Sequence, residues 1–524
     1  MPHQSTAIPA FLFGLTALTP APPAAAQHLL ATHVGTVVNG RLGTVIRGVG
    51  DQDGDGTGDF VVSEPGASST YAGRAFLISG RTRGTLATFD GQLGSGIWAL
   101  GASDVCPIGD VNGDGRGDFA IGYGGRSALD VFSGATGTRL YRLGGAIEYF
   151  PTACGVGDHD GDGKDDFAVM VYINSVAQVW IVKGTNGVQL ATVAAAVSDG
   201  SLRDVGDQTG DGRTEIAVIA PTRTEVFNLH PIGLVRQLNT VSISSYRNFD
   251  LGDWNGDGRL DLVWRFEVRP SASHFVYSLA TGTQLVAFAL PESLSNNSPQ
   301  GMAVLGDIDG DLVPDVAVRV DTDSIHAGSY GHVAILSGRT GQRIGDWPGS
   351  AQYAAGRQLA GIGDVDADGF PDFAMDTYAQ SAPSGAGAWQ VISGRTVAAM
   401  VQKPSNCYGG PFPPQIGMTR PVLGANVTIA GVDVPPGSPG WLVLSRMPGL
   451  PTNLGYGGCD AWYDLGSGAL LANLTQSPSW QLTMPLPNVR ALVGLEVALQ
   501  ALYFGTASPL GFDLTNGIWA RLGY

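Results

Sequence analysis

Seven short stretches of this chain share one spacing of acidic residues. Each is nine residues long, with an acid at positions 1, 5 and 9 and glycine at position 4 or 6 or both. The stretches are residues 51–59, 110–118, 158–166, 207–215, 253–261, 307–315 and 364–372. Carboxylates this close repel one another unless a cation lies between them, and oxygen ligands in a small flexible loop favour calcium.

The side chains at positions 1, 3, 5 and 9 are the candidate metal ligands, and up to seven Ca²⁺ ions are expected. They are Asp51, Asp53, Asp55 and Asp59; Asp110, Asn112, Asp114 and Asp118; Asp158, Asp160, Asp162 and Asp166; Asp207, Thr209, Asp211 and Glu215; Asp253, Asn255, Asp257 and Asp261; Asp307, Asp309, Asp311 and Asp315; Asp364, Asp366, Asp368 and Asp372. Solvated Asp-Gly turns without metal are the alternative. Seven copies with acids at the same three positions argue against it.

The loops are not equivalent. The third has the full set of carboxylates, whereas Thr209 and Glu215 predict a weaker site in the fourth. In the sixth, Leu312 stands where the turn requires glycine, which predicts a strained or empty site.

The spacing of the loops indicates a repeat architecture. Their first aspartates are 59, 48, 49, 46, 54 and 57 residues apart. Four short apolar runs surround each loop, and a Ser-Gly-Arg-Thr type of turn, as at residues 79–82, separates the third run from the fourth. Seven units of four antiparallel strands predict an all-β, seven-bladed β-propeller over residues 28–403. An open solenoid is the rival, but it requires capping repeats that the sequence lacks.

A propeller closes when one end of the chain completes the sheet at the other end. Residues 28–32 resemble the fourth run at residues 189–192, and we expect them to join the last blade at its outer edge. Residues 397–401 are the alternative for that place.

The N-terminus predicts export. Residues 1–26 contain an apolar core at 8–18 and three alanines before Gln27, as in a secretory signal peptide, although no lysine or arginine precedes Arg41. We therefore expect a secreted, extracellular or cell-surface protein. No other run is long and apolar enough to span a bilayer.

Composition changes after Lys403. Residues 404–524 begin with a stretch rich in proline and glycine, contain no aspartate loop and predict a small β-sandwich-like domain. Cys407 and Cys459 are expected to pair in an oxidising compartment. Cys106 and Cys154 occupy equivalent places in neighbouring repeats, either bridged or as two buried thiols.

The acidity of the chain belongs largely to the loops. They hold more than half of its 46 acidic residues, and seven divalent ions would neutralise most of the formal charge of −17. No basic patch supports nucleic-acid binding.

These repeats resemble the FG-GAP repeats of integrin α-subunit propellers and of secreted bacterial proteins. The likeness rests on a loop followed at once by an apolar strand, as at residues 109–120, with a partial Gly-Ala-Pro signature at residues 64–67. The other Phe-Gly and Gly-Ala-Pro signatures are mostly degenerate. The resemblance implies a seven-bladed propeller with calcium in the inter-strand loops and ligands on the face away from the metals.

A binding module fits the sequence better than an enzyme. The chain contains no nucleophile elbow, His-Glu-x-x-His or phosphate-binding glycine loop. We expect an extracellular binding, adhesion or scaffold role toward protein or glycan ligands. The alternative is a secreted hydrolase or oxidoreductase with its site at the channel mouth, since fold does not determine function.

An Arg-Gly-Asp tripeptide and a set of loop aromatics resemble binding features, but both are expected to be structural. Residues 116–118 spell Arg-Gly-Asp, the tripeptide that integrins recognise, but Asp118 is a position-9 metal ligand and should not be free to bind a receptor. Aromatic residues in the long loops suit ligand recognition, although any single one is expected to pack between blades. They are Tyr71, Trp98, Tyr123, Tyr149, Phe150, Tyr330, Tyr353 and Tyr378.

Overall fold

The structure is a computed structural model and describes most of residues 28–523. Outside the described residues lie 1–27, 68–71, 92–99, 125–127, 145–147, 174–175, 194–199, 221–222, 240–248, 269–270, 290–300, 310, 321–331, 342, 349–352, 380–384, 396–398, 404–406, 409–413, 447–451, 455–458, 465, 467, 475–478, 507–509 and 524. The expected signal peptide at residues 1–26 is among them.

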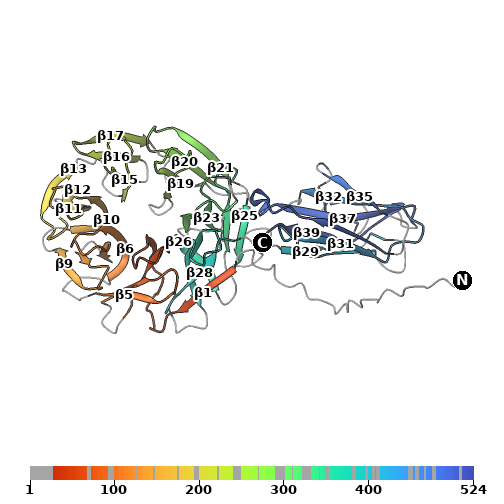
Figure 1. Ribbon diagram of the computed structural model, residues 1–524, viewed down its shortest axis with the longest axis horizontal. Helices are drawn as coiled ribbons and strands as arrows, with labels where there is room; N and C mark the ends of the chain where they lie inside the picture. Colours follow the sequence, from red (N-terminus) through yellow and green to blue (C-terminus); the bar gives the residue numbers. More distant parts are fainter. Residues whose placement is uncertain are drawn as a thin grey trace.

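Within the described residues, seven antiparallel sheets of four strands follow one another along the chain and surround a common centre (Figure 1). The first three are β2 (Ile46–Gly50), β3 (Asp59–Glu64), β4 (Arg74–Ile78) and β5 (Thr85–Asp90); β6 (Leu100–Gly109), β7 (Asp118–Tyr123), β8 (Ala128–Phe132) and β9 (Arg139–Gly144); β10 (Glu148–Gly157), β11 (Asp166–Ile173), β12 (Val176–Val182) and β13 (Gln189–Val193). The next three are β14 (Ser201–Asp204), β15 (Ile216–Ala220), β16 (Arg223–Leu229) and β17 (Ile232–Asn239); β18 (Phe249–Gly252), β19 (Asp261–Val268), β20 (Ser271–Ser278) and β21 (Gln284–Ala289); β22 (Met302–Val304), β23 (Val316–Val320), β24 (His332–Leu336) and β25 (Arg343–Pro348). The seventh has the order β26 (Tyr353–Gly363), β27 (Asp372–Ala379), β28 (Ala388–Ser393) and β1 (His28–Val34), arranged as β1-β28-β27-β26.

The aspartate loops connect the first and second strands of each sheet. In the first sheet Gly50 at the end of β2 pairs with Asp59, which is both position 9 of the loop and the first residue of β3. The second strand is largely buried, and β3 and β7 are buried along their whole length. The loop therefore begins at the exposed end of one strand and finishes inside the core.

Seven buried apolar clusters join the sheets, and each draws on two successive sheets. Phe89 of the first sheet, for example, packs against Phe119 and Phe132 of the second, with ring centroids 5.5 and 5.3 Å apart. The last cluster joins the seventh sheet to the first through residues such as Trp389 and Phe60. Sheets that pack face to face and return to the start form a β-propeller.

The N-terminal strand completes the last sheet. β1 pairs antiparallel with β28, from His28 opposite Ser393 to Val34 opposite Ala388, and His33 stacks on Trp389. Of the two expected arrangements, the structure thus has the first. The competing segment becomes β29 (Ala399–Lys403), which pairs with β39 of the C-terminal region.

This pairing corrects the expected domain boundary. The propeller ends before Ala399 rather than at residue 403, because β29 takes its hydrogen-bond partners from the C-terminal sheet. Sequence composition changes only after Lys403, at the proline- and glycine-rich stretch, so it placed the boundary too late.

Within the described residues, the C-terminal region forms two larger sheets and one two-stranded sheet. One contains β29, β32 (Gly440–Arg446), β35 (Ala469–Leu474), β37 (Glu496–Phe504), β38 (Phe512–Leu514) and β39 (Gly517–Arg521); the other contains β30 (Gln415–Met418), β31 (Asn426–Val432) and β36 (Trp480–Pro485). β33 (Thr452–Asn453) pairs with β34 (Asp460–Ala461), and a 3-10 turn, η2, spans Arg490–Leu492. One apolar cluster takes residues from both large sheets, such as Ile429 and Leu499, as in a β-sandwich.

The cysteines separate into two kinds. Cys407 and Cys459 form a disulfide with their Cα atoms 4.4 Å apart, as expected. Cys106 and Cys154 are buried thiols rather than a bridge. Burial raises the pKa of Cys106 to about 12, so this thiol stays protonated.

Among the described residues, no helix has the length and apolar character needed to cross a bilayer.

Candidate metal centres

The acid at position 9 is buried in every loop. Its residue exposure is between 0 and 1% in all seven cases: Asp59, Asp118, Asp166, Glu215, Asp261, Asp315 and Asp372. Desolvation raises the pKa of each above its ordinary value, to about 6 in Asp118 and Asp261 and to about 7 in Asp372. A buried carboxylate that resists ionisation gains from a nearby positive charge.

Backbone N–H groups hold this carboxylate in a repeated arrangement. In the first loop, Asp59 accepts from the N–H of Gln52 at position 2 (2.7 Å) and from the N–H of Gly80 (2.9 Å). Gly80 belongs to the Ser-Gly-Arg-Thr turn between the third and fourth strands. The same pair of donors recurs for Asp118, Asp166, Asp315 and Asp372.

This contact explains the repeated glycine of that turn. A Cβ atom at Gly80 would lie 1.9 Å from the carbonyl oxygen of Gly58, at position 8 of the loop. The corresponding distance is between 1.8 and 2.0 Å at Gly134, Gly184, Gly338 and Gly394. The sequence revealed the turn as a repeat, but its role in seating the position-9 acid became evident only from the structure.

The backbone of each loop curls around the carboxylate at position 1. Asp51 accepts from the N–H groups of Gly54 (2.6 Å), Asp55 (3.2 Å) and Gly56 (2.8 Å). The hydrogen bond from Gly56 has the largest effect in lowering the pKa of Asp51, and the bonds from Gly54 and Asp55 lower it further. Asp51 therefore stays ionised. Gly54 and Gly56 have φ of +80° and +82°, which glycine adopts at little cost.

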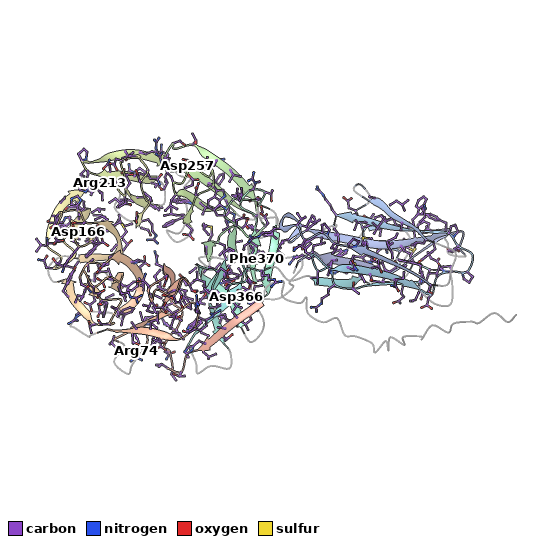
Figure 2. The ribbon with its side chains drawn as sticks, viewed as in Figure 1. Arg74, Asp166, Arg213, Asp257, Asp366 and Phe370 are labelled. Carbon is purple, nitrogen blue, oxygen red and sulfur yellow. A yellow bond between two sulfur atoms is a disulfide. The ribbon has the colours of Figure 1, made fainter. Side chains whose placement is uncertain are left out.

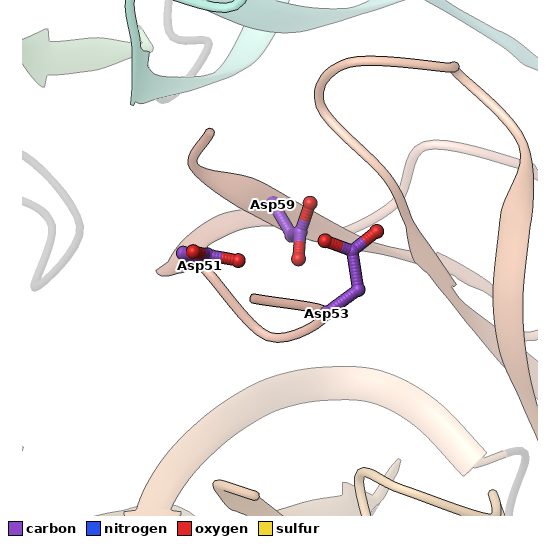
Figure 3. A group of neighbouring side chains, drawn as sticks. All are labelled: Asp51, Asp53 and Asp59. Carbon is purple, nitrogen blue, oxygen red and sulfur yellow. The ribbon is translucent and has the colours of Figure 1, made fainter. Parts of the chain in front are cut away.

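Three carboxylates converge in five of the loops. In the first loop, oxygens of Asp51, Asp53 and Asp59 all lie within 4.8 Å of one another (Figure 3). The other groups are Asp158, Asp160 and Asp166; Asp207, Asp211 and Glu215; Asp307, Asp309 and Asp311; and Asp364, Asp366 and Asp372. An all-oxygen donor set around one point fits a hard divalent cation such as calcium.

The second and fifth loops have asparagine at position 3. The Asn112 amide donates to Asp114 (2.8 Å), and the Asn255 amide donates to Asp257 (3.1 Å). Each asparagine offers one oxygen where the other loops offer a carboxylate, so these sites would carry less negative charge.

Basic side chains already contact several position-5 aspartates. Arg81 lies 3.1 Å from Asp55, and Arg339 lies 3.0 Å from Asp311. In the third loop the Lys183 ammonium lies 2.6 Å from Asp162 and also contacts Asp160. This lysine competes with a cation in the loop that has the most carboxylates, a contact that the loop sequence alone does not reveal.

Two loops lack a glycine where the backbone requires a left-handed conformation. Leu312, at position 6 of the sixth loop, has φ of +68° and is 87% exposed, which agrees with the strain expected there. Ala367, at position 4 of the seventh loop, has φ of +63°. Both loops nevertheless keep the converging carboxylates.

The fourth loop differs at two positions, as its sequence indicated. Asp207, Asp211 and Glu215 bring their oxygens together. The Thr209 hydroxyl donates to Glu215 (3.3 Å), so it supports the position-9 acid within the loop.

The Arg-Gly-Asp tripeptide is part of the architecture of the second loop. Asp118 is fully buried, and Arg116 donates to the carbonyl oxygens of Gln52 and Asp53 in the first loop. Neither side chain is presented to a receptor.

Of the eight aromatic residues in the long loops, Tyr123 is the one whose side chain belongs to the described part of the structure. Tyr123 is 1% exposed and joins the core between the first and second sheets, where its hydroxyl donates to Asp130 (2.8 Å). Tyr71, Trp98 and Tyr330 lie outside the described residues, as do the side chains of Tyr149, Phe150, Tyr353 and Tyr378.

A second charged cluster lies on the first strands of four sheets. Arg47 of β2 pairs with Asp104 of β6 (2.9 Å), and Arg203 of β14 lies 3.8 Å from the same carboxylate. Burial, together with the charge of Arg47, lowers the pKa of Arg203. The carboxylate of Asp250 in β18 acts in the opposite direction on the pKa of both arginines. A charged residue within an otherwise apolar strand run was the only signal of this cluster in the sequence.

Comparison with known proteins gives structural similarity alone. No family model matches the chain, and no curated protein matches its sequence. Similar solved structures include BBS1N in complex with ARL6DN (8% identity, TM-score 0.42), BamB from Moraxella catarrhalis (13%, 0.37) and the Myceliophteria thermophila Cps50 (Swd1) β-propeller domain (12%, 0.43). Each match covers 70% of this chain and 97, 98 and 99% of the respective structure. These overlaps are loose, and the sheet order and the seven inter-sheet cores are what establish the chain as a β-propeller.

Proposed function

We propose that this chain is a secreted, seven-bladed β-propeller that binds calcium in its inter-strand loops. The observation that carries the metal proposal is the convergence of three carboxylates in each of five loops, four of which include the buried position-9 acid. Those acids are desolvated and crowded, so an ion that neutralises them stabilises the folded chain. The donor set is oxygen only, and the ring of ligands is small and flexible, as calcium requires.

Calcium would act here as a structural ion. With free calcium about ten times above Kd, each site contributes about 1.4 kcal/mol to the free energy of unfolding. Five or more such sites match the typical 5–15 kcal/mol stability of a whole domain. An extracellular location, where calcium is abundant, agrees with this dependence.

Native mass spectrometry and thermal melts of the full chain test the metal proposal. We expect several bound calcium ions, and chelation with EGTA should lower Tm by about 5–15 °C. Asp166→Asn should remove one ion and lower Tm, whereas Asp90→Asn, a surface acid paired with Arg74, should do neither. A chain that retains no calcium, or that melts identically in EGTA, contradicts the proposal.

We further infer a binding or scaffold role from the outer rim of the propeller. The outermost strand of each sheet contains a β-bulge, and the residue that the bulge leaves unpaired is aliphatic in all seven: Leu86, Leu140, Leu190, Val235, Leu285, Ile344 and Leu30. Bulges redirect side chains at sheet edges.

Four of these rim residues are exposed. The exposed fractions are 40, 38, 37 and 36% for Leu86, Leu140, Val235 and Leu285. Exposed apolar side chains at the same place on four blades suit a protein ligand that contacts several blades. The expected role is an extracellular binding, adhesion or scaffold module, and a glycan ligand is the other class to be tested.

Arrays of extracellular proteins and glycans probed with purified chain test the binding role. Wild-type protein should bind a ligand that the triple variant Leu86→Asp, Leu140→Asp, Leu285→Asp no longer binds, while circular dichroism shows that the fold is kept. Equal binding by both proteins contradicts a rim site. Hydrolytic or redox turnover of the ligand in the same preparation would instead support an enzyme.

A further inference from the structure

Arginines of one sheet contact the aspartate loop of the preceding sheet through the carbonyl at position 2. Arg116, at position 7 of the second loop, donates to the carbonyl oxygen of Gln52 at position 2 of the first loop and to that of Asp53 (2.9 Å). Arg83 of the first sheet donates to the carbonyl oxygen of Val365, at position 2 of the seventh loop (3.3 Å). At both junctions the donor belongs to the next sheet along the ring.

The junction between the sixth and seventh loops takes its arginine from the C-terminal domain. Arg490 donates to the carbonyl oxygens of Ile308 (3.1 Å) and Asp307 (2.9 Å), at positions 2 and 1 of the sixth loop. It also donates to the carbonyl oxygen of Gly369 (3.1 Å), at position 6 of the seventh. Its guanidinium lies 4.4 Å from the centre of the Phe370 ring.

Phe370 occupies the place that an arginine has in the second loop. It stands at position 7 of the seventh loop, where the second loop has Arg116, so the seventh loop has no basic side chain of its own at that place. Figure 2 shows Phe370 on the side of the ring that faces the C-terminal domain. Arg490 occupies the space above its ring and reaches the carbonyls of both loops.

A close backbone contact lies beside this arginine. Gly494 has φ of +78°, and a Cβ atom there would lie 2.4 Å from the carbonyl oxygen of Ile344 in β25. Among the described residues, the C-terminal domain therefore contacts the propeller at the loop junction and at the outer strand of the sixth sheet.

We propose that calcium in the sixth and seventh loops controls the docking of the C-terminal domain on the propeller. The inference rests on the calcium role proposed above. The three acceptors of Arg490 are backbone carbonyls of the loops themselves, and ligation of an ion orders the residues that carry them. Arg490 binds this ordered arrangement, and by thermodynamic reciprocity its binding strengthens calcium binding in the same two loops.

Small-angle X-ray scattering and calcium titration of the full chain test the proposal. In calcium the wild-type chain should be compact, and Arg490→Ala should increase its radius of gyration. Calcium binding at two sites should weaken about 5-fold or more in this variant, the lower end of typical couplings. Arg490→Lys keeps the charge but loses the planar donor fork, and it should behave like Arg490→Ala.

Loop variants separate local from global effects. Asp307→Asn and Asp364→Asn should each loosen the C-terminal domain, while Asp158→Asn in the remote third loop should lose an ion without changing the radius of gyration. Arg116→Ala removes the equivalent arginine of the second loop and should also leave the domain docked.

Gly494→Ala provides a second route to the same result. It should undock the domain, whereas Gly505→Ala, with φ of +71° and no neighbour within 4 Å, introduces similar backbone strain without the clash. Equal effects of these two substitutions would contradict the contact with Ile344.

Each contrary outcome has a distinct meaning. A wild-type radius of gyration in Arg490→Ala overturns the docking. Calcium affinity that rises in Arg490→Ala shows that charge repulsion outweighs ordering, and overturns the coupling. Native mass spectrometry tests the proposed calcium binding independently of docking. A wild-type chain without calcium refutes both the calcium binding and the coupling. A wild-type chain that binds calcium while its C-terminal domain is undocked refutes the coupling alone.

Discussion

Leu312 and Ala367 show how single residues depart from the loop pattern without breaking it. Both adopt a left-handed backbone conformation that glycine occupies in the other loops. For a residue with a Cβ atom this conformation costs about 1–2 kcal/mol. The converging carboxylates around them are kept, so the surrounding hydrogen bonds impose the conformation on the loop.

Leu312→Gly should therefore stabilise the protein. Leu312 is 87% exposed, so little packing is lost, and relief of strain should raise the free energy of unfolding by about 1 kcal/mol. Urea denaturation in excess calcium measures the change. Leu140→Gly, an exposed leucine within β9, is the control and should destabilise. A loss of stability in Leu312→Gly would mean that its backbone is not strained.

The buried position-9 acids predict an unusual pH dependence of the metal-free chain. Desolvation raises the pKa of Asp118 and Asp261 to about 6 and that of Asp372 to about 7, against an ordinary value of 3.8. Between these values the folded state binds more protons than the unfolded state. Stability from these groups is therefore full below pH 3.8 and is lost as the pH rises toward 7.

In EGTA, the urea midpoint should accordingly be higher at pH 5 than at pH 7.5. Calcium should remove or reverse this trend, because it binds the deprotonated carboxylates and its affinity rises with pH. Asp372→Asn cannot ionise at that position and should flatten the profile in EGTA. A metal-free chain whose stability rises steadily across this range would show that the position-9 acids are not desolvated.

At the level of the elements, a glycine in the turn after the third strand holds the aspartate loop in five of the seven blades. This turn brings a backbone N–H from the end of the third strand to the acid that begins the second strand, and so attaches the aspartate loop to the outer half of the sheet. The fit leaves no room for a side chain at the glycine.

Gly134→Ala should thus lower the free energy of unfolding by about 2–3 kcal/mol, through overpacking and a weakened hydrogen bond to Asp118. Its Cβ atom would lie 2.0 Å from the carbonyl oxygen of Gly117. Gly417→Ala, with no neighbour within 4 Å, should change stability little. Chemical denaturation compares the two variants, and equal effects would show that the turn can move away from the loop.

Periodicity in the sequence predicted the strands around each loop, and the structure places the loops between first and second strands as expected. Sequence periodicity did not predict the bulges of the outermost strands or the hydrogen bonds that the turn glycines donate to the position-9 acids. A bulge such as that at Leu86 depends on strand register, which local composition does not specify. The contact of Gly80 with Asp59 joins residues on two separate turns.

At the scale of the molecule, β1 closes the ring. It covers the edge of β28, and residues Leu30 and Ala31 pack against the cluster between the seventh and first sheets. Without it, β28 would present an unpaired edge and the last sheet would lose its outermost strand.

Removal of residues 1–34 should therefore lower Tm and cause association of the chain. Removal of residues 1–27 alone leaves β1 in place and should change neither property. Differential scanning fluorimetry and size-exclusion chromatography distinguish the two truncations. A stable monomer lacking residues 1–34 would show that β1 does not hold the ring closed.

The sequence by itself determined the repeat, the acidic loops, the strand content and the disulfide between Cys407 and Cys459, because each follows from local spacing or from residue chemistry. Tertiary structure decided which segment completes the last sheet, where the propeller ends, and which side chains from distant blades meet. β29 pairs with β39 rather than with β28, and Arg490 reaches loops that precede it by more than a hundred residues. These choices depend on competition between partners far apart in the chain, and its outcome is set by geometry that only the assembled ring provides.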